Sequence, residues 1–521
     1  MSDTQRSSSS VGFAGVTISG TVWSTGQILF NKFLTIAAIW IISRQLTQDE
    51  FGSAALAITV VKFLSVLPPL NMGDVLMLRV SRSARANRIA VVLVLKVGVI
   101  TTLCLAMGSP LVASFYSQYP SSMFIGLLLV AGMRPSAEAM QVGNLTKLRM
   151  SFKNRTIALI DGGVQFASTL IAVVMALMSC GAWVIVIPPT AAVFAKAALY
   201  DVARRRSCAI TSETVDVIDT NDNRTTSQTI QRHFIATSGG QYFHSIADSL
   251  PILVLGKFAS ESETGVYAFA LSLSGQANTL VAGQIAGVLQ PVLGRLADDP
   301  HRQAEGYLRT MRLISAIAIP ICVVQAFFSE FIFSWVFEER WQPASHVFAV
   351  LSICEAFFFA SAPTMAMLKA QGRFHTFLAW QGAQLVGSCV LLPIAALMGG
   401  GLAVAICATC LWAVGLPIAV WLSLRNSGHT IWDALRLFAI PWLTALPIGM
   451  LGWFVGSQSL VLGRGGAILA TLVIAPIVLL IMLSATRWTQ PAVFREMMLL
   501  VRMVIQRVWG VHRLFVGKPI G

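Results

Sequence analysis

Charge is scarce in this chain. Only 12% of its 521 residues are charged and just 23 are acidic, whereas soluble domains carry roughly 25% charged residues. Hydrophobic residues make up 55% of the sequence, and the mean hydropathy is +0.72. A surface of this composition cannot face water, which excludes a soluble enzyme.

Motifs for nucleotide, metal or nucleophilic chemistry are also missing from the sequence. It contains no Walker loop, glycine-rich dinucleotide fingerprint, nucleophile elbow or metal-ligand cluster. Eight cysteines are scattered along it. Cys407 and Cys410 have the CxxC spacing but fall in an apolar run, where we expect packing rather than redox chemistry. We therefore expect no cofactor, no metal, no catalytic residue and no enzymatic activity.

Long apolar runs dominate what is present. Runs of about 20 apolar residues cross a bilayer as helices, and these runs are too long and too uniform for barrel strands. We predict an all-α polytopic membrane protein with spans near residues 18–42, 53–77, 89–115, 122–142, 157–178, 181–200, 233–256, 265–289, 311–337, 344–368, 375–398, 401–424, 437–455 and 465–486.

The basic residues support this map of fourteen spans. Loops on one side, together with both termini, hold 28 of the 37 Lys and Arg residues, and the opposite loops hold four. The positive-inside rule then places both termini in the cytoplasm. The net charge of +14 is explained by these loops, so we expect no nucleic-acid partner.

The sequence predicts six segments. We expect a disordered cytoplasmic N-terminus (1–17), a six-helix N-lobe (18–200), a cytoplasmic linker (201–232), a six-helix C-lobe (233–424), two additional spans (425–486) and a tail (487–521). The tail is basic and amphipathic, which favours contact with anionic membrane lipids. A plain solvated tail is the alternative.

The two lobes match at a constant offset of 213 residues. Gly52 then pairs with Gly265 and Arg44 with Lys257, and the loops RQLTQDEFG and KFASESETG share their length, basic start and closing glycine. Six spans separate the copies, so they run in the same direction, as parallel repeats. Such lobes meet in a V-shaped cleft; chance similarity is the alternative.

Each lobe begins with a helix that has one polar face. Gln27 and Asn31 belong to the stripe in the first span, and His244 and Asp248 belong to the stripe in the seventh. We interpret both stripes as the lining of a cavity. Hydrogen bonding between neighbouring helices is the alternative.

The segment GTVWSTGQILFNKFLTIAAIWIISRQLTQDEFGSAALAITVVKFLSVL resembles the Wzx-type polysaccharide flippases of the polysaccharide transporter family. Those proteins join their first two helices by a similar R-x-L-[TS]-x-x-[DE]-[FY]-G loop. The resemblance implies the multidrug/oligosaccharidyl-lipid/polysaccharide exporter superfamily, with two MATE-like six-helix lobes and here two C-terminal helices.

That resemblance also implies a substrate and a location. The cargo would be an undecaprenyl-pyrophosphate-linked oligosaccharide for exopolysaccharide, capsule or O-antigen. It would cross the inner (cytoplasmic) membrane of a bacterium. A glycan polymerase and export machinery would be further partners.

Five basic residues lie inside predicted spans, all in the N-lobe. Each costs on the order of 2.5–3.5 kcal/mol at the membrane centre on insertion scales, so an anionic ligand such as pyrophosphate would explain them. We assign substrate binding to Lys32, Lys62, Lys96 and Arg134, together with Gln27 and Asn31. For Arg134, an ion pair with Glu138 is the alternative. Lys196 is expected to reach the cytoplasmic surface.

Three residues are candidates for ion coupling. Asp248 stands one turn beyond His244, and Glu355 is the other acid deep in a span. A histidine and an aspartate one turn apart suit proton transfer, although a structural hydrogen bond between them is the alternative.

Two rival functions remain open. A multidrug or cation antiporter of the same superfamily should line its cleft with acids, against which Lys32 and Lys62 argue. A membrane-embedded glycan polymerase or ligase needs a site outside the bilayer, and the predicted outer loops are too short to supply one.

Overall fold

The computed structural model describes residues 31, 34–65, 84–150, 154–208, 223–296, 299–459, 463–499 and 502. Within these ranges the structure is helical and contains no strand. Gln27, Lys32, the 1–17 segment, most of the linker (209–222) and the end of the tail lie outside the described residues.

The described helices fit a membrane. Those long and apolar enough to cross one are Val94–Phe115, Ser121–Leu148, Arg155–Leu177, Trp183–Arg206, Pro300–Phe327, Pro343–Ala370, Phe374–Ser427, Ile431–Ser459 and Arg464–Thr489. The chain is therefore a multi-pass membrane protein of all-α class, as predicted. The total of fourteen spans stays a prediction.

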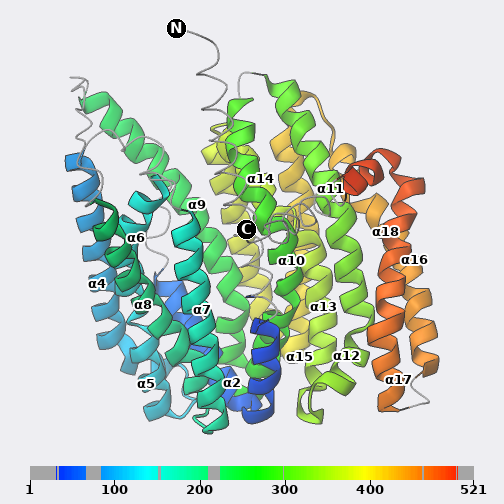
Figure 1. Cartoon of the computed structure of the whole chain (residues 1–521), viewed down its shortest axis with the longest axis horizontal. Coiled ribbons are helices and arrows are strands. Elements are labelled where there is room, and N and C mark those ends of the chain that lie inside the picture. Colours follow the sequence, from blue (N-terminus) through cyan, green and yellow to red (C-terminus); the bar gives the residue numbers. More distant parts are fainter. Residues whose placement is uncertain are drawn as a thin grey trace, which may run out of the picture. The chain divides into compact units, whose positions relative to one another are not determined.

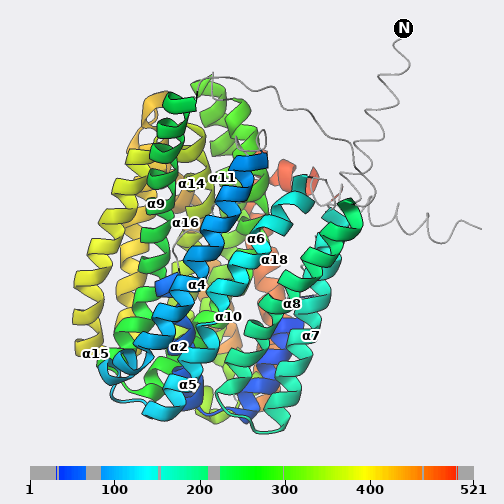
Figure 2. The same cartoon turned by 90° about the vertical axis from the view of Figure 1, so that its left-hand side faces the viewer.

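The chain divides into two compact units. Unit 1 consists of Met1–Phe269 and Gln381–Cys407. Its helices are α2 (Gln48–Ser65), α4 (Ala84–Phe115), α5 (Ser121–Ala131), α6 (Arg134–Met150), α7 (Asn154–Leu177), α8 (Trp183–Cys208), α9 (Asn223–Phe258), the start of α10 (Glu261–Arg295) and the middle of α15 (Phe374–Leu424). Helix α8 packs against α6 and α7, and α2 packs against α5 and α9 (Figure 2).

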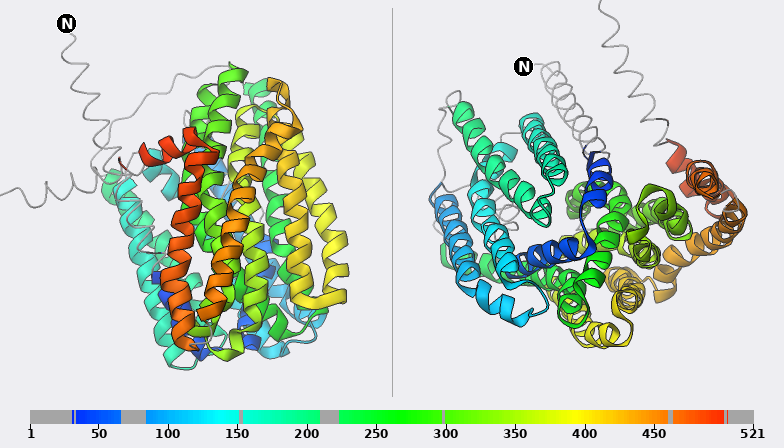
Figure 3. Two further views of the ribbon diagram at one scale, coloured as in Figure 1. Left: turned by 90° about the vertical axis from the view of Figure 1, so that its right-hand side faces the viewer. Right: turned by 90° about the horizontal axis from the view of Figure 1, so that it is seen from below.

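Unit 2 consists of Ala270–Trp380 and Ala408–Gly521. It adds α11 (Pro300–Phe327), α12 (Ser329–Val336), α13 (Pro343–Phe358), α14 (Ser361–Ala370), α16 (Ile431–Ser459), α17 (Arg464–Leu469) and α18 (Ala475–Thr489) to parts of α10 and α15 (Figure 1). Helices α16 and α18 lie side by side and both pack against α11 (Figure 3).

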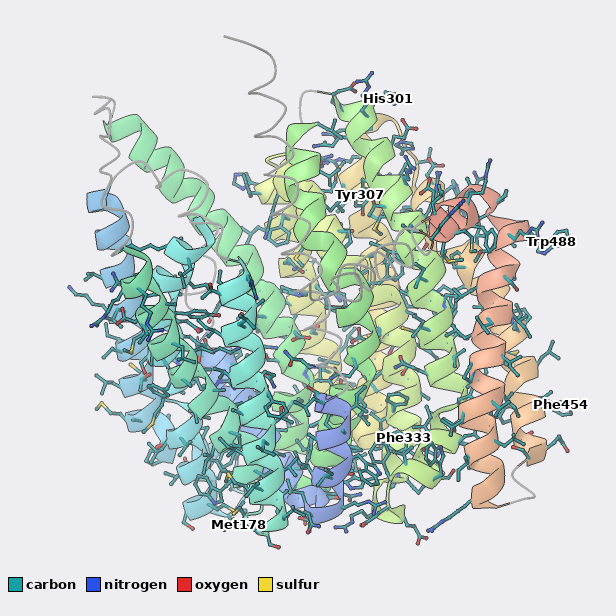
Figure 4. All side chains as sticks on the ribbon, in the orientation of Figure 1. Met178, His301, Tyr307, Phe333, Phe454 and Trp488 are labelled. Atoms are coloured by element: carbon teal, nitrogen blue, oxygen red, sulfur yellow. The ribbon has the colours of Figure 1, made fainter. Side chains whose placement is uncertain are left out.

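Side chains in unit 2 separate into an interior and a lipid-facing surface. Tyr307, Phe359 and Phe377 are fully buried in its core. Phe454 on α16 and Trp488 on α18 point away from the bundle, and Trp488 is 86% exposed (Figure 4). Exposed apolar side chains of this size suit lipid contact, since a water-soluble monomer rarely exposes extended apolar patches.

Local sequence signals fix the starts of α2 and α10. At α2, the Thr47 N–H donates to Glu50 Oε2 (2.9 Å) and the Glu50 N–H donates to Thr47 Oγ1 (3.3 Å). This is a complete capping box. At α10, the Glu263 N–H donates to Ser260 Oγ (3.2 Å). The two caps stand at the predicted offset of 213.

Two glycines with left-handed backbone turn the chain between neighbouring helices. Gly181 (φ +57) stands between α7 and α8, and Gly400 (φ +58) bends α15 between the predicted spans 375–398 and 401–424. A Cβ on Gly181 would lie 2.8 Å from Glu50 Oε1, and a Cβ on Gly400 would lie 2.7 Å from Glu263 Oε1. Each capping acid therefore contacts the turn glycine of its own half of the sequence.

Some predicted spans are interrupted. The 122–142 span is divided at Gly132 into α5 and α6, the 311–337 span at Phe328 into α11 and α12, and the 344–368 span at Phe359–Ala360 into α13 and α14. Hydropathy averages over such breaks because the residues at each break remain apolar. The boundaries of the predicted lobes stay a prediction.

Candidate substrate and ion site

An ion pair on two neighbouring helices is the centre of the candidate site. Lys62, in the last turn of α2, donates from Nζ to Asp248 Oδ2 on α9 at 2.6 Å. Both side chains keep access to the surroundings, with 49% of Lys62 and 44% of Asp248 exposed. The sequence placed both residues at functional positions but did not indicate that they pair.

His244 lies one turn before Asp248 on α9 and interacts with it electrostatically. The predicted coupling pair is thus close together, but the short hydrogen bond of Asp248 goes to Lys62. An ammonium, a carboxylate and an imidazole occupy this part of unit 1. Such a set can bind an anion at Lys62 or a cation at Asp248, provided that the ion pair opens.

Asn31 belongs to the same unit and is half-buried. Its backbone carbonyl accepts a hydrogen bond from Thr35 Oγ1 at 2.7 Å. Its side-chain Oδ1 is buried and has no hydrogen-bond donor among the described residues. A buried amide oxygen without a donor is uncommon, and it leaves Asn31 able to accept a hydrogen bond from a ligand.

Two further predicted cations, Lys96 and Arg134, are among the described residues. Lys96 lies exposed on α4, on a face that it shares with the exposed Val99 and Ile100. Arg134 pairs with Glu138 on α6 (Nη2 to Oε1, 3.8 Å), which is the alternative that the sequence left open.

Lys196 shows a partner that the sequence did not predict. Its Nζ lies 3.0 Å from Asp161 Oδ1, which joins α8 to α7. We expected Lys196 to reach the cytoplasmic surface, but the nearby carboxylate on the neighbouring helix provides a closer counter-charge. The pair explains both residues without a ligand.

Glu355 belongs to unit 2, on α13, whereas Lys62 and Asp248 belong to unit 1. It is half-buried, and its Oε1 would lie 3.6 Å from a Cβ on Gly275 of α10. Gly275 is the position that corresponds to Lys62 at the offset of 213. Glu355 therefore lies beside α10 within unit 2.

A search against family models matches residues 41–346, more than half of the chain, to the family described as "Polysaccharide biosynthesis protein". The chain belongs to this family. The resemblance drawn from the first two predicted spans is thereby confirmed. The matched range includes Lys62, Asp248 and His244.

A curated relative supports the same assignment. The chain is 21% identical over 435 residues to "Succinoglycan biosynthesis transport protein ExoT" of Rhizobium meliloti (strain 1021), covering 81% of this chain and 83% of the relative. The alignment thus spans most of both proteins, and that relative is described as a transport protein.

Solved structures share the fold at low identity. The chain matches "Lipid II flippase MurJ, inward closed conformation" with a TM-score of 0.63 and 13% identity, over 91% of this chain and 98% of that one. It also matches a multidrug resistance MATE family transporter of the MOP superfamily with a TM-score of 0.52 and 14% identity, over 80% and 95%. The all-α, MATE-like fold is therefore shown.

Proposed function

We propose that this protein moves a pyrophosphate-linked oligosaccharide lipid across the inner membrane of a bacterium for surface polysaccharide assembly. The observation that supports it is an accessible ammonium, Lys62, inside a predicted span of a polysaccharide biosynthesis protein. A diphosphate offers several acceptor oxygens and is a stronger partner for an ammonium than a single carboxylate.

The exchange at Lys62 gives the transport step a chemical basis. An incoming diphosphate would take the Lys62 ammonium from Asp248, because both are anions that compete for the same donor. Asp248 would then be an unpaired carboxylate next to His244, where a proton or a small cation compensates its charge. Binding of the lipid substrate would in this way recruit a counter-ion at Asp248.

The membrane potential would assist export. An inside-negative potential drives negative charge outward, and each exported negative charge releases about 2.3 kcal/mol per 100 mV. A cation that moves inward while bound at Asp248 also moves down this potential and releases further free energy. We propose alternating access through a cation-lined cavity as the mechanism, with Asn31 as a hydrogen-bond acceptor for the substrate.

Lys62→Ala and Lys62→Arg test the proposal together. We expect Lys62→Ala to abolish surface polysaccharide while the protein still inserts, and Lys62→Arg to retain part of the export because it keeps the charge. Lys196→Ala is the matched control, since it also removes a paired lysine from a predicted span. Normal polysaccharide in Lys62→Ala cells would overturn the proposal.

The Asp248 carboxylate favours one second candidate, a multidrug or cation antiporter. A cationic drug could take Asp248 from Lys62 as readily as an anion takes Lys62 from Asp248. Deletion of the gene distinguishes the two. Drug sensitivity with normal surface glycan supports the antiporter, whereas loss of glycan with unchanged drug sensitivity supports the flippase.

A further inference from the structure

Helices α2 and α10 meet backbone to backbone at their first turns. A Cβ on Gly52 would lie 2.2 Å from the carbonyl oxygen of Glu261, and a Cβ on Gly265 would lie 1.9 Å from that of Gln48. Real Cβ atoms do not approach an oxygen so closely. Because the obstacles are backbone atoms, only glycine fits at either position.

The contact is reciprocal. Gly52 corresponds to Gly265 at the offset of 213, and Gln48 corresponds to Glu261 at the same offset. Each helix therefore places its glycine against the equivalent carbonyl of the other helix, as expected where two related segments meet across a twofold axis. We call this contact, between Gln48–Gly52 and Glu261–Gly265, the glycine seam.

Further hydrogen bonds extend the seam. The Ser262 hydroxyl donates to Gln48 Oε1. The Tyr119 hydroxyl donates to Thr264 Oγ1 at 3.2 Å, and Lys257 Nζ donates to the carbonyl oxygen of Phe115 at 2.7 Å. Each bond joins a residue before the 201–232 linker to a residue after it. All of them lie inside unit 1.

Each helix of the seam also contacts a turn from its own half of the chain. Glu50 contacts the Gly181 turn and Glu263 contacts the Gly400 turn, as described above. Loops that charge counting places on the outer face supply all of these contacts, namely those near residues 45, 118, 180, 260 and 400. Met178, in the third of these loops, is labelled in Figure 4. The seam thus lies at the end of unit 1 that is predicted to face outward.

The packing of the seam suits repeated opening. Its central contact is between two glycines, so no side chain has to change rotamer when the helices separate or return. The surrounding bonds are a few neutral or singly charged hydrogen bonds, each of which contributes roughly 1 kcal/mol net. Water replaces such bonds readily at a helix end.

We propose that the glycine seam is the outer gate of this transporter, closed in the present structure and parted when the transport path opens outward. The proposal concerns how the protein moves and does not depend on which molecule it carries. It predicts that side chains buried in the seam become accessible during transport. It also predicts that the gate cannot close around any residue larger than glycine.

Accessibility of Thr264 tests the gate directly. Thr264 is fully buried next to Gly265 and is covered by Tyr119, so Thr264→Cys should react slowly with a membrane-impermeant maleimide added from outside. Adding Gly52→Ala should raise that labelling several-fold. Gly108→Ala and Gly163→Ala are matched controls, because a Cβ at either position meets nothing within 4 Å. Equal labelling in Gly52→Ala and the controls would overturn the proposal.

A disulfide across the seam covers the case in which Gly52→Ala does not fold. Gln48→Cys with Ser262→Cys places one thiol on each of the two helices that meet at the seam, and mass spectrometry identifies the linked peptide among the native cysteines. We expect oxidation to stop polysaccharide export and reduction to restore it. Undiminished export by the linked protein would overturn the gate. Because Thr264 labelling involves no glycan, failure of the proposed substrate would not affect that result.

Discussion

Lys62 on α2 and Asp248 on α9 are 186 residues apart in the sequence and form a hydrogen-bonded ion pair at 2.6 Å. The pair leaves no net charge at this position. A ligand of either sign must therefore compete with an internal ion of its own sign. Substituting either residue should therefore change the affinity of the other for its ligand. The roles of Lys62 and Asp248 can be tested separately in this way.

Removing the internal competitor should strengthen anion binding. Asp248→Asn frees the Lys62 ammonium, so we expect the purified protein to bind a pyrophosphate-linked lipid several-fold more tightly than wild type. Turnover should fall because release is slower. Native mass spectrometry with a lipid diphosphate measures the first effect, and polysaccharide export in cells measures the second.

The matched control for this prediction is Asp161→Asn. It breaks the Lys196–Asp161 pair, which also joins two helices of unit 1, but we assign it no ligand. Its affinity should stay at the wild-type level. Weaker binding in Asp248→Asn than in wild type would contradict the exchange at Lys62.

The two helix caps should stabilise the fold by similar amounts. Thr47→Ala and Ser260→Ala each remove the hydroxyl that accepts from an N-terminal backbone N–H, which costs about 1 kcal/mol per cap. Thermal unfolding in detergent should show a lower midpoint for both. Ser114→Ala is the control, because its exposed hydroxyl donates to the Leu111 carbonyl within its own helix and caps no helix start. Unchanged midpoints in both cap variants would contradict the prediction.

Sequence patterns predicted the helical class and the apolar surface, whereas the equivalence of residues 213 positions apart stays a prediction. Each span must match the bilayer by itself, and each loop charge responds to the membrane by itself. Hydropathy and loop charge can therefore be interpreted for one segment without knowing how the helices pack. The helix caps at Thr47 and Ser260 were also present in the sequence as the T-x-x-E and S-x-x-E patterns. They were interpreted only as similar loops.

Contacts between helices could not be read in the same way. The offset identifies Gly52 and Gly265 as equivalent, but no periodicity shows that equivalent residues touch. Likewise Lys62 and Asp248 were each identified as unusual inside a span, and their pairing depends on how α2 packs against α9. Arg134 and Glu138 were predictable as a pair because they lie one turn apart on one helix.

The loss of stability on replacing a turn glycine by alanine should depend on which atoms surround the new methyl group. Gly181→Ala and Gly400→Ala place a methyl group in a left-handed conformation, at a cost of roughly 1–2 kcal/mol, and also press on the Glu50 or Glu263 carboxylate. Gly372→Ala has the same backbone strain (φ +66) but meets nothing within 4 Å. Midpoints of unfolding should therefore fall further for the first two, and equal losses in all three would contradict a role for the acids.

Proton uptake at the seam should favour its closed state. Glu261 is the first residue of α10. Burial, followed by the charge of Asp49 on α2, raises its pKa from 4.5 to about 7. Its Oε1 has no hydrogen-bond donor among the described residues. The other titratable groups here are Glu50 on α2, Glu263 on α10, Lys257 on α9, and Tyr119, whose own pKa is raised chiefly by burial.

The sign follows from linkage. If the pKa of Glu261 is ordinary when the seam is open, the closed seam binds one more proton between about pH 4.5 and 7. Closure is then favoured at low pH, weakens as pH rises to about 7, and stays constant above it. Labelling of Thr264→Cys should accordingly rise with pH beyond the change in thiol reactivity. Glu261→Gln supplies the control, since it keeps the same thiol without the titrating acid. Identical labelling profiles with Glu261 and with Gln at this position would show that the seam does not sense protons.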